Sequence, residues 1–372
     1  MEKTVRILHI LQRMEAGGTQ ALLMNLYRNI DRTKIQFDFL VEYPDKQFYD
    51  DEILSMGGRI FYSNVRNDKN IFRFQKQLED ILRKYKYQIV HVHAFTIGYF
   101  CLRTAHKCGV PVRIAHSHNN ETVRDSKYLL KRIMQKLYPI YATDLFACSK
   151  EAGKYLFHSK KFHVLNNAID SSKFTANPTV RDDVRKELRI GDRIAVGHVG
   201  RFHAQKNHDF LLDVFAGFKK KHSNSVLILV GSGDLENQIR EKISALGLDD
   251  SVMLLGNRKD MNRIYQAMDI FLLPSLFEGL GIVAVEAQAA GIPVIASDGV
   301  SLDAKVSPLI HYVKLSRGAS EWSEAAEKAL KSEYCHKNMQ KYIIKSGFDV
   351  KSTAGFLQNF YIKKSGMKQG EV

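Results

Sequence analysis

Two carboxylates flank a glycine-rich turn in the second half of the chain. Glu278 and Glu286 stand eight residues apart, and the turn 279–282 between them opens into an Ala-rich run that favours a helix. The apolar run 270–273 before them predicts a strand. The first amides of such a helix lack intrahelical partners and favour a phosphate, whereas carboxylates accept hydrogen bonds from hydroxyls. A diphosphate combined with hydroxyls describes a nucleotide sugar.

Two cations follow another predicted strand, 194–199. Arg201 stands just after its end, and Lys206 comes five residues later. Fixed cations at a strand end can hold a diphosphate and stabilise the charge on a departing nucleotide. The competing interpretation is a pair of solvated charges in the loop of a basic protein.

Gly17 and Gly18 follow the predicted first strand, 5–11, and precede a helical pattern. Glycines at this place let a phosphate approach the backbone closely, or they simply form a tight turn. The full dinucleotide fingerprint G-x-G-x-x-G is missing, so the pair alone decides nothing.

Histidines occur as H-x-H pairs at two further strand ends, His91 with His93 and His116 with His118. A period of two puts both members of a pair on one side of a sheet. Imidazole suits zinc, but no carboxylate cluster accompanies the pairs, so we expect no metal here. His118 is a candidate for a polar role in an active site, and His91 fits a core histidine equally well.

Bulk composition limits the choice of class. The chain has 372 residues, enough for two domains, and a net charge of +15 that suits acidic substrates, an anionic membrane surface or nucleic acid. No signal peptide or membrane-spanning run is visible, and the four cysteines lack metal-ligand or disulfide spacing. The sequence therefore predicts a cytoplasmic protein with reduced thiols.

Strand-like runs alternate with amphipathic helical patterns along the chain, which predicts parallel sheets covered by helices on both faces. The expected strands are 5–11, 37–41, 89–93, 112–116, 145–148, 163–165, 194–199, 226–230, 252–255, 270–273 and 293–296. Turn and linker residues gather near 166–181, after which the alternation restarts. We predict an α/β fold of two doubly wound domains facing a cleft: 1–175 with a returning helix at about 348–365, and 176–347.

With these motifs in order, the sequence resembles glycosyltransferase family 4, a family of GT-B fold with two Rossmann-like domains and an E-x7-E motif, here Glu278 to Glu286. The companion motifs are Gly17-Gly18, Gly200-Arg201, Lys206-Asn207, the Gly-Ser-Gly run 231–233, and 256–269. The runs 25–31 and 113–119 are similar to bacterial capsular and exopolysaccharide transferases. The resemblance covers about residues 5–300.

The resemblance implies transfer of a sugar, with retention, from a nucleotide sugar such as a UDP-sugar, without a metal or other cofactor. Arg201, Lys206 and the amides of 280–282 would hold the diphosphate. Glu286 would accept from the ribose hydroxyls, and Glu278 would face the sugar. The implied catalytic residues are His118, Arg201, Lys206 and Glu278, and the implied donor-binding residues are Gly17, Gly18, Arg201, Lys206, Arg258, Glu278, Gly279, Leu280, Gly281, Ile282 and Glu286.

This sequence departs from the family pattern at two turns. Gly281 stands where a proline is common, and Ala168 follows Asn167 where a glycine is usual. Gly281 keeps an N–H that proline would remove, so phosphate binding is not threatened. Ala168 puts only the local turn in question.

The expected partners are a nucleotide sugar and a lipid-linked saccharide acceptor. The stretch 124–137 interleaves basic with apolar residues, which fits either an anionic membrane surface, on the inner face of the plasma membrane, or a helix packing its apolar side inward. No recognition motif favours nucleic acid. Two other functions remain open: a nucleotide-sugar epimerase of the same fold, and a non-catalytic scaffold with a vestigial site.

Overall fold

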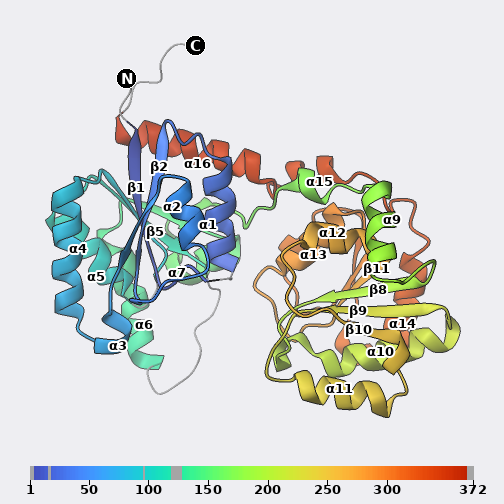
Figure 1. The fold of residues 1–372 in the computed structure, drawn as a ribbon. Helices are drawn as coiled ribbons and strands as arrows, with labels where there is room; N and C mark the ends of the chain where they lie inside the picture. The colour runs from blue at the N-terminus through green and yellow to red at the C-terminus, as the bar shows by residue number, and fades with distance from the viewer. Residues whose placement is uncertain (1–3, 16–17, 95–96, 119–127, 367–372) are drawn as a thin grey trace. The chain divides into compact units, whose positions relative to one another are not determined.

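The computed structural model of the chain describes residues 4–15, 18–94, 97–118 and 128–366. The chain divides into two compact units, the first formed by Met1–Ile169 with Val350–Val372 and the second by Asp170–Asp349. Figure 1 shows each unit as a sheet with helices on both of its faces.

The first unit contains a seven-stranded parallel sheet in the order β3-β2-β1-β4-β5-β6-β7. Its strands are β1 (Val5–Leu11), β2 (Ile35–Val41), β3 (Arg59–Tyr62), β4 (Ile89–Val92), β5 (Val112–Ser117), β6 (Asp144–Ala147) and β7 (His163–Val164). The inner strands are buried on both faces, as parallel strands covered by helices must be.

Two apolar cores fill the two faces of this sheet. The helices of the unit are α1 (Gly18–Asn29), α2 (Asp50–Ser55), α3 (Val65–Asp68), α4 (Ile71–Tyr85), α5 (Gly98–Lys107), α6 (Tyr128–Leu137), η1 (Tyr138–Tyr141), α7 (Lys150–Phe157) and α16 (Val350–Ser365). One core joins the sheet to α1 and α16, and the other joins it to α4, α5 and α7. The C-terminal helix thus packs on the first unit, through Leu357 and Tyr361 among others.

The second unit contains a six-stranded parallel sheet in the order β10-β9-β8-β11-β12-β13. Its strands are β8 (Ile194–Val199), β9 (Ser225–Val230), β10 (Val252–Leu254), β11 (Ile270–Leu273), β12 (Val294–Ala296) and β13 (Ile310–Tyr312). Its helices are α8 (Ser171–Phe174), α9 (Pro178–Glu187), η2 (Ala204–Lys206), α10 (His208–Lys221), α11 (Glu236–Ala245), η3 (Asp249–Ser251), α12 (Met261–Ala267), α13 (Ile282–Ala289), η4 (Leu302–Ala304), η5 (Leu315–Arg317), α14 (Gly318–Ala329) and α15 (Gln340–Lys345).

The predicted α/β class with two doubly wound units is confirmed by these sheets. In each sheet the strand order reverses between the unit's first strand and its fourth, β1 with β4 and β8 with β11. In doubly wound sheets, ligands bind outside the carboxyl ends of the strands at this reversal. The fold therefore singles out the loops after β1, β4, β8 and β11.

Candidate functional site

The loops that follow β8 and β11 bring two charged residues of opposite sign together. Lys206 Nζ lies 2.5 Å from Glu278 Oε1, and both side chains are largely buried. Ser275 Oγ donates to the same carboxylate oxygen at 2.7 Å. The loops are also joined by backbone bonds, because Leu276 N donates to the Gln205 carbonyl at 2.8 Å. The glutamate and the lysine identified from the sequence thus lie together at one corner of the second unit.

Arg201 differs from Lys206 in having no counter-charge. Its side chain is exposed, and among the described residues its guanidinium forms no hydrogen bond or ion pair. An unpaired cation beside a neutral Lys–Glu pair leaves net positive charge at the carboxyl end of β8. That charge favours an anionic ligand.

Glycines let the strand-end loops of this unit approach each other closely. A Cβ on Gly231 would lie 2.1 Å from the Gly200 carbonyl oxygen, and one on Gly233 would lie 2.5 Å from the Phe202 carbonyl oxygen. Phe202 N donates to the Ser232 carbonyl at 2.9 Å across the same contact. The Gly-Ser-Gly run therefore positions the Arg201 loop by backbone contact.

Helix α13 begins at the turn that the two glutamates flank. Gly281 precedes it with φ of 74°, in the left-handed region that glycine adopts without strain and proline cannot adopt. The family's usual proline is thus incompatible with this turn, and the first amides of α13, including that of Ile282, have no intrahelical acceptor. Gly279 and Leu280 lie in the loop immediately before this turn.

Glu286 lies in the second turn of α13 and points toward a buried tyrosine of α12. Tyr265 O–H donates to Glu286 Oε2 at 2.9 Å. Burial raises the pKa of Glu286 to about 7, and the bond from Tyr265 opposes that rise. A carboxyl group whose pKa lies near 7 is suited to accept hydrogen bonds from hydroxyls, because each such bond favours its ionised form.

Arg258 forms hydrogen-bonded ion pairs with two carboxylates. Its Nε and Nη2 contact Asp260 at 2.8 Å each, and Nη2 also contacts Glu187 at 3.0 Å. These bonds raise its pKa further above the usual range. A role for Arg258 in donor binding stays a prediction, and it would require the side chain to share or exchange these partners.

In the first unit, Gly18 is the first residue of α1 and is exposed, whereas Gly17 lies outside the described residues. His118 follows β5, and its Nε2 lies 2.8 Å from His93 Nδ1. Burial lowers the pKa of His118 to about 3, so its ring is neutral at physiological pH. A neutral imidazole can donate or accept a hydrogen bond but does not serve as a cation.

Two further turns have simple structures. Ser149 caps α7, where its side chain accepts from Ala152 N at 3.1 Å. Ala168 is buried and is not among the residues of positive φ, so this turn does not need the family's glycine.

Sequence reasoning missed three residues that complete these sites: Tyr265, Ser275 and His9. Tyr265 and Ser275 hold the two glutamates, and His9 lies on β1 within hydrogen-bond distance of His93. A polar residue inside an apolar strand was the available signal for His9. Tyr265 carried no signal, because its spacing fits an ordinary core position.

Two doubly wound parallel sheets covered by helices define an α/β protein of two Rossmann-like units. Residues 180–347 match the family model described as glycosyl transferases group 1, and residues 16–173 match that of glycosyltransferase family 4. A putative glycosyltransferase of Bacillus subtilis, EpsF, is 36% identical over 96% of both chains. The chain belongs to the glycosyltransferases of family 4 type, with the GT-B fold.

Further relatives and solved structures agree with this placement. A UDP-Gal:alpha-D-GlcNAc-diphosphoundecaprenol alpha-1,3-galactosyltransferase of Escherichia coli is 25% identical over 79% of both chains. The crystal structure of Anabaena Alr3699/HepE in complex with UDP is similar with a TM-score of 0.78, covering 96% of this chain and 100% of that one at 16% identity. A glycosyltransferase from Rickettsia africae reaches a TM-score of 0.79 at 17% identity, covering 98% of this chain and 100% of that one.

Proposed function

We propose that this glycosyltransferase moves a sugar from a UDP-sugar to a lipid-linked or oligosaccharide acceptor in bacterial surface polysaccharide synthesis. The observation that carries the proposal is the corner of the second unit where Lys206, Glu278 and the start of α13 meet beside the unpaired Arg201. Support comes from relatives named for capsular polysaccharide biosynthesis in Staphylococcus aureus and for transfer from UDP-Gal in Escherichia coli.

Each residue of this corner has a definite task in the proposal. Arg201 and the first amides of α13 bind the diphosphate, and Lys206 turns toward it as the donor arrives. Glu278, released in part from Lys206, accepts from hydroxyls of the sugar. Glu286 accepts from the ribose hydroxyls, since its carboxyl group already receives one hydroxyl donor from Tyr265.

We propose that the transfer needs no metal, because the leaving diphosphate meets cations and helix amides that act in its place. Retention follows if the departing phosphate takes the proton of the acceptor on the same face of the sugar. NMR of the product reads the anomeric configuration, and inversion would overturn this part of the proposal.

The acceptor side includes a candidate membrane surface on the first unit. Helix α6 exposes Leu129 (74%) and Ile133 (47%), and η1 exposes Ile140 (55%), so apolar side chains of the basic stretch face solvent. Among the described residues, no helix is long and apolar enough to cross a bilayer. Exposed apolar residues beside lysines and arginines fit peripheral contact with the inner, anionic leaflet of the plasma membrane.

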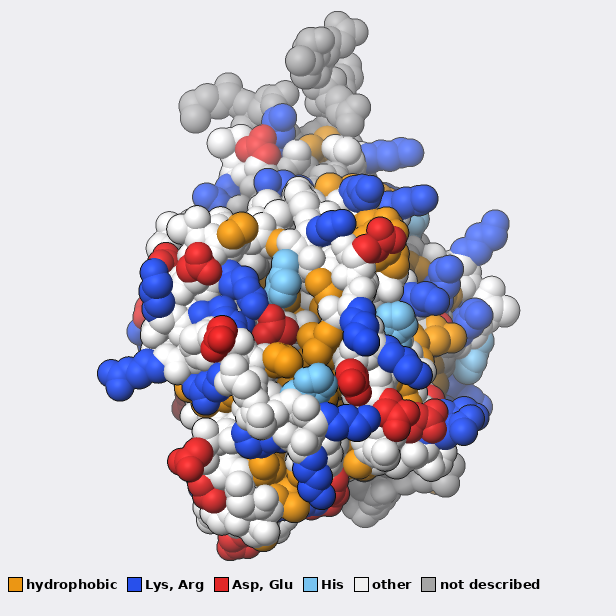
Figure 2. Space-filling view, turned by 90° about the vertical axis from the view of Figure 1, so that its right-hand side faces the viewer, with side chains coloured by type: hydrophobic (Ala, Val, Ile, Leu, Met, Phe, Trp, Pro, Cys, Tyr) orange, Lys and Arg blue, Asp and Glu red, His pale blue; other side chains and the backbone are white. Residues whose placement is uncertain are grey.

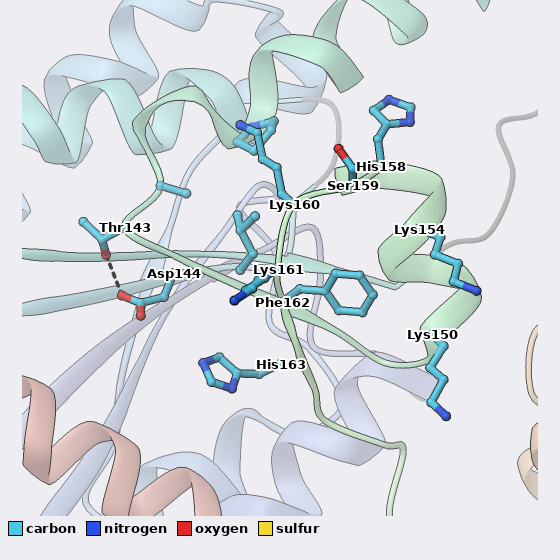
Figure 3. A pocket seen from close by; sticks show the side chains of 13 residues that line it. Thr143, Asp144, Lys150, Lys154, His158, Ser159, Lys160, Lys161, Phe162 and His163 are labelled. Atoms are coloured by element: carbon cyan, nitrogen blue, oxygen red, sulfur yellow. Dashed lines mark hydrogen bonds between the residues drawn. The ribbon is translucent and has the colours of Figure 1, made fainter.

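A basic groove adjoins this surface, with a volume of about 920 Å³. Figure 3 shows the side chains of Lys150, Lys154, Lys160 and Lys161 around it. Flotation with vesicles of phosphatidylglycerol and phosphatidylcholine tests the surface. The pair Leu129→Ser and Ile133→Ser should abolish binding, and unchanged binding would contradict membrane contact through α6.

The positive charge of the protein does not by itself point to nucleic acid. On the face drawn in Figure 2, lysines and arginines lie scattered with aspartates and glutamates between them. A nucleic-acid footprint would instead gather one sign of charge along a face or a helix.

A thermal-shift panel of UDP-, GDP- and ADP-sugars tests the donor. A UDP-sugar should raise the melting temperature, and Glu286→Ala should abolish the shift, whereas the exposed Glu324→Ala on α14 should keep it. A donor that is converted without any acceptor would support an epimerase instead. No shift with any nucleotide would support a scaffold and would refute the proposal.

A further inference from the structure

Two hydrogen-bonded rows of side chains lie in the first unit, one running from β1 past the ends of β4 and β5 and the other from α16 across β4 to β5. In the first row His9 Nδ1 lies 3.0 Å from His93 Nε2, and His93 Nδ1 lies 2.8 Å from His118 Nε2. In the second, His91 lies 2.6 Å from the Tyr361 hydroxyl and 3.0 Å from His116 Nδ1. We propose that the first row is a positioning relay that fixes His118 as an N–H donor, at Nδ1, toward an oxygen of the substrate.

The geometry of the first row is that of N–H···N hydrogen bonds. The ring centres of His93 and His118 are 5.1 Å apart and their facing nitrogens 2.8 Å, so the bond lies close to the line between the ring centres. The His9–His93 contact repeats this arrangement at 5.3 and 3.0 Å. Ligands of one zinc ion at about 2.0–2.1 Å would instead sit about 3.3 Å apart and aim at a common point.

Counting protons restricts the row to two states. Burial lowers the pKa of His9 and of His118 to about 3 and that of His93 well below its usual range, so each ring is neutral and carries one N–H. Three N–H groups serve two hydrogen bonds, which leaves one N–H at an end of the row. His93 must donate through one nitrogen and accept through the other, so all bonds run in the same direction.

The buried end decides the direction. His9 is fully buried, its Nε2 has no hydrogen-bond partner among the described residues, and its ring lies against Phe37 and Phe39. An orphaned buried N–H is rarer than an orphaned buried acceptor. His118 Nδ1 is also shielded and unpaired among the residues that the structure describes, but it belongs to a partly exposed residue at the end of β5, whereas the whole of His9 is enclosed. We therefore assign the spare N–H to His118 Nδ1, the end that a ligand can reach by displacing its cover. A hydroxyl or phosphate oxygen of the substrate can accept it.

The inference rests on the proposed function, but its main test does not need turnover. The protein is labelled with ¹⁵N-histidine, and long-range ¹H–¹⁵N spectra read the tautomer of each ring, with His118→Phe assigning the signal. We expect His118 protonated at Nδ1 and bare at Nε2. The opposite tautomer, or a mixture of both in the unmodified protein, would overturn the relay.

His93→Phe keeps an aromatic ring but cuts the first row, so His118 should become a tautomer mixture. His91→Phe is the control: it replaces a histidine two residues earlier, within β4, and cuts only the second row. An unchanged His118 tautomer in His93→Phe refutes the relay. If that variant does not fold, the tautomer of the unmodified protein still decides the question.

Turnover of a UDP-sugar provides a second reading. His93→Phe should lower kcat/KM roughly tenfold, the scale on which hydrogen-bond partners that orient a histidine act. His91→Phe should leave it within about twofold. If neither the parent nor any variant turns over a nucleotide sugar, the proposed function is refuted. The tautomer measurement remains valid in that case. A melting-temperature rise with Zn²⁺ that disappears in His93→Phe would overturn the relay in favour of a metal site.

Discussion

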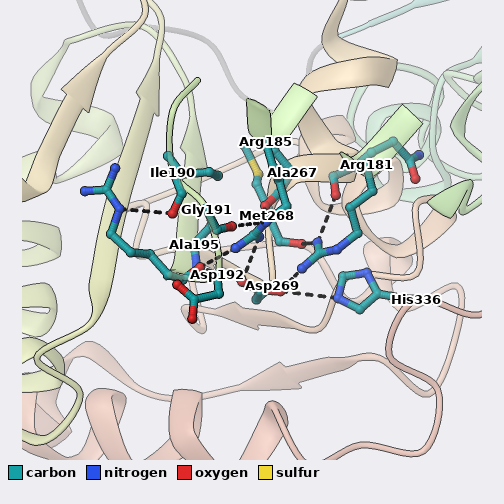
Figure 4. Close-up of polar contacts among 12 residues, drawn as sticks. Arg181, Arg185, Ile190, Gly191, Asp192, Ala195, Ala267, Met268, Asp269 and His336 are labelled. Atoms are coloured by element: carbon teal, nitrogen blue, oxygen red, sulfur yellow. Dashed lines mark hydrogen bonds and ion pairs between the residues drawn. The ribbon is translucent and has the colours of Figure 1, made fainter. Parts of the chain in front are cut away.

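The two ends of the β8–β11 strand pair handle charge in opposite ways. At the amino end Asp269 is bonded by Arg181 Nη2 at 2.6 Å, Arg185 Nη1 at 3.3 Å and Ala195 N at 2.7 Å (Figure 4). His336 lies 3.4 Å away and completes the ring of donors. At the carboxyl end, Arg201 has no partner among the described residues.

The pKa values of the carboxyl groups at these two ends follow the same division. Burial would raise the pKa of Asp269, but His336, the two arginines and the Ala195 amide together lower it to about 2. Burial raises the pKa of Glu286 to about 7 with one hydroxyl to oppose it. Asp269 is thus surrounded by donors that stabilise its charge, whereas Glu286 receives one hydroxyl donor and can accept further donors from a ligand.

The largest expected effect is on stability, at the amino end. Asp269→Asn keeps the shape but leaves Arg181 and Arg185 without their counter-charge, so the free energy of unfolding should fall by about 3 kcal/mol. Because folding lowers the pKa of Asp269, its stabilisation is present above its ordinary pKa of 3.8 and is lost as the pH falls towards 2. The variant should lose this part of the acid dependence.

Urea unfolding of the parent and the variant at pH 7 and at pH 3 measures both effects. Asp183→Asn is the control, since Asp183 is an exposed residue of α9 that forms no ion pair with any residue the structure describes. Equal stability of Asp269→Asn and Asp183→Asn would show that the cluster in Figure 4 does not anchor the sheet.

The next effect is on activity, at the carboxyl end. Arg201→Ala should lower kcat/KM about 100-fold, the scale for removing one group that stabilises a developing negative charge. The melting temperature should stay the same, because no described residue loses a partner. Arg240→Ala on α11 removes the same charge from an exposed site that, within the described part of the chain, pairs only with Glu236. Equal losses in the two variants would indicate that net charge, and not position, matters.

The sequence predicted the central strands of each sheet better than the edge strands. The strands Val5–Leu11, Ile194–Val199 and Ile270–Leu273 were predicted to the residue, because apolar runs bounded by turns are local signals. The strands Arg59–Tyr62 and Ile310–Tyr312 were missed, since edge strands are short and only partly apolar.

The candidate site was predictable where it follows a strand end. Glu278 and Lys206 were both identified, but their direct contact was not, because it joins residues 72 positions apart. The partners that set pKa values, Tyr265 for Glu286 and His9 for the histidine row, come from other elements that only the fold brings close. Local sequence patterns predict where a strand ends, but they do not predict which residues of neighbouring elements contact that end.

The smallest expected effect tests the role of Tyr265. Ribose hydroxyls bond best to an ionised Glu286, so UDP should bind more tightly as the pH rises through about 7 and should release a proton. Tyr265→Phe removes the donor that lowers this pKa, which should move the midpoint upward and weaken binding at pH 7 by a few-fold, with recovery at higher pH. Calorimetry at several pH values, in buffers of different ionisation enthalpy, measures affinity and proton release together. Glu286→Gln cannot titrate and should give a flat profile, so superimposable curves for Tyr265→Phe and the parent would show that this hydroxyl does not set the charge of Glu286.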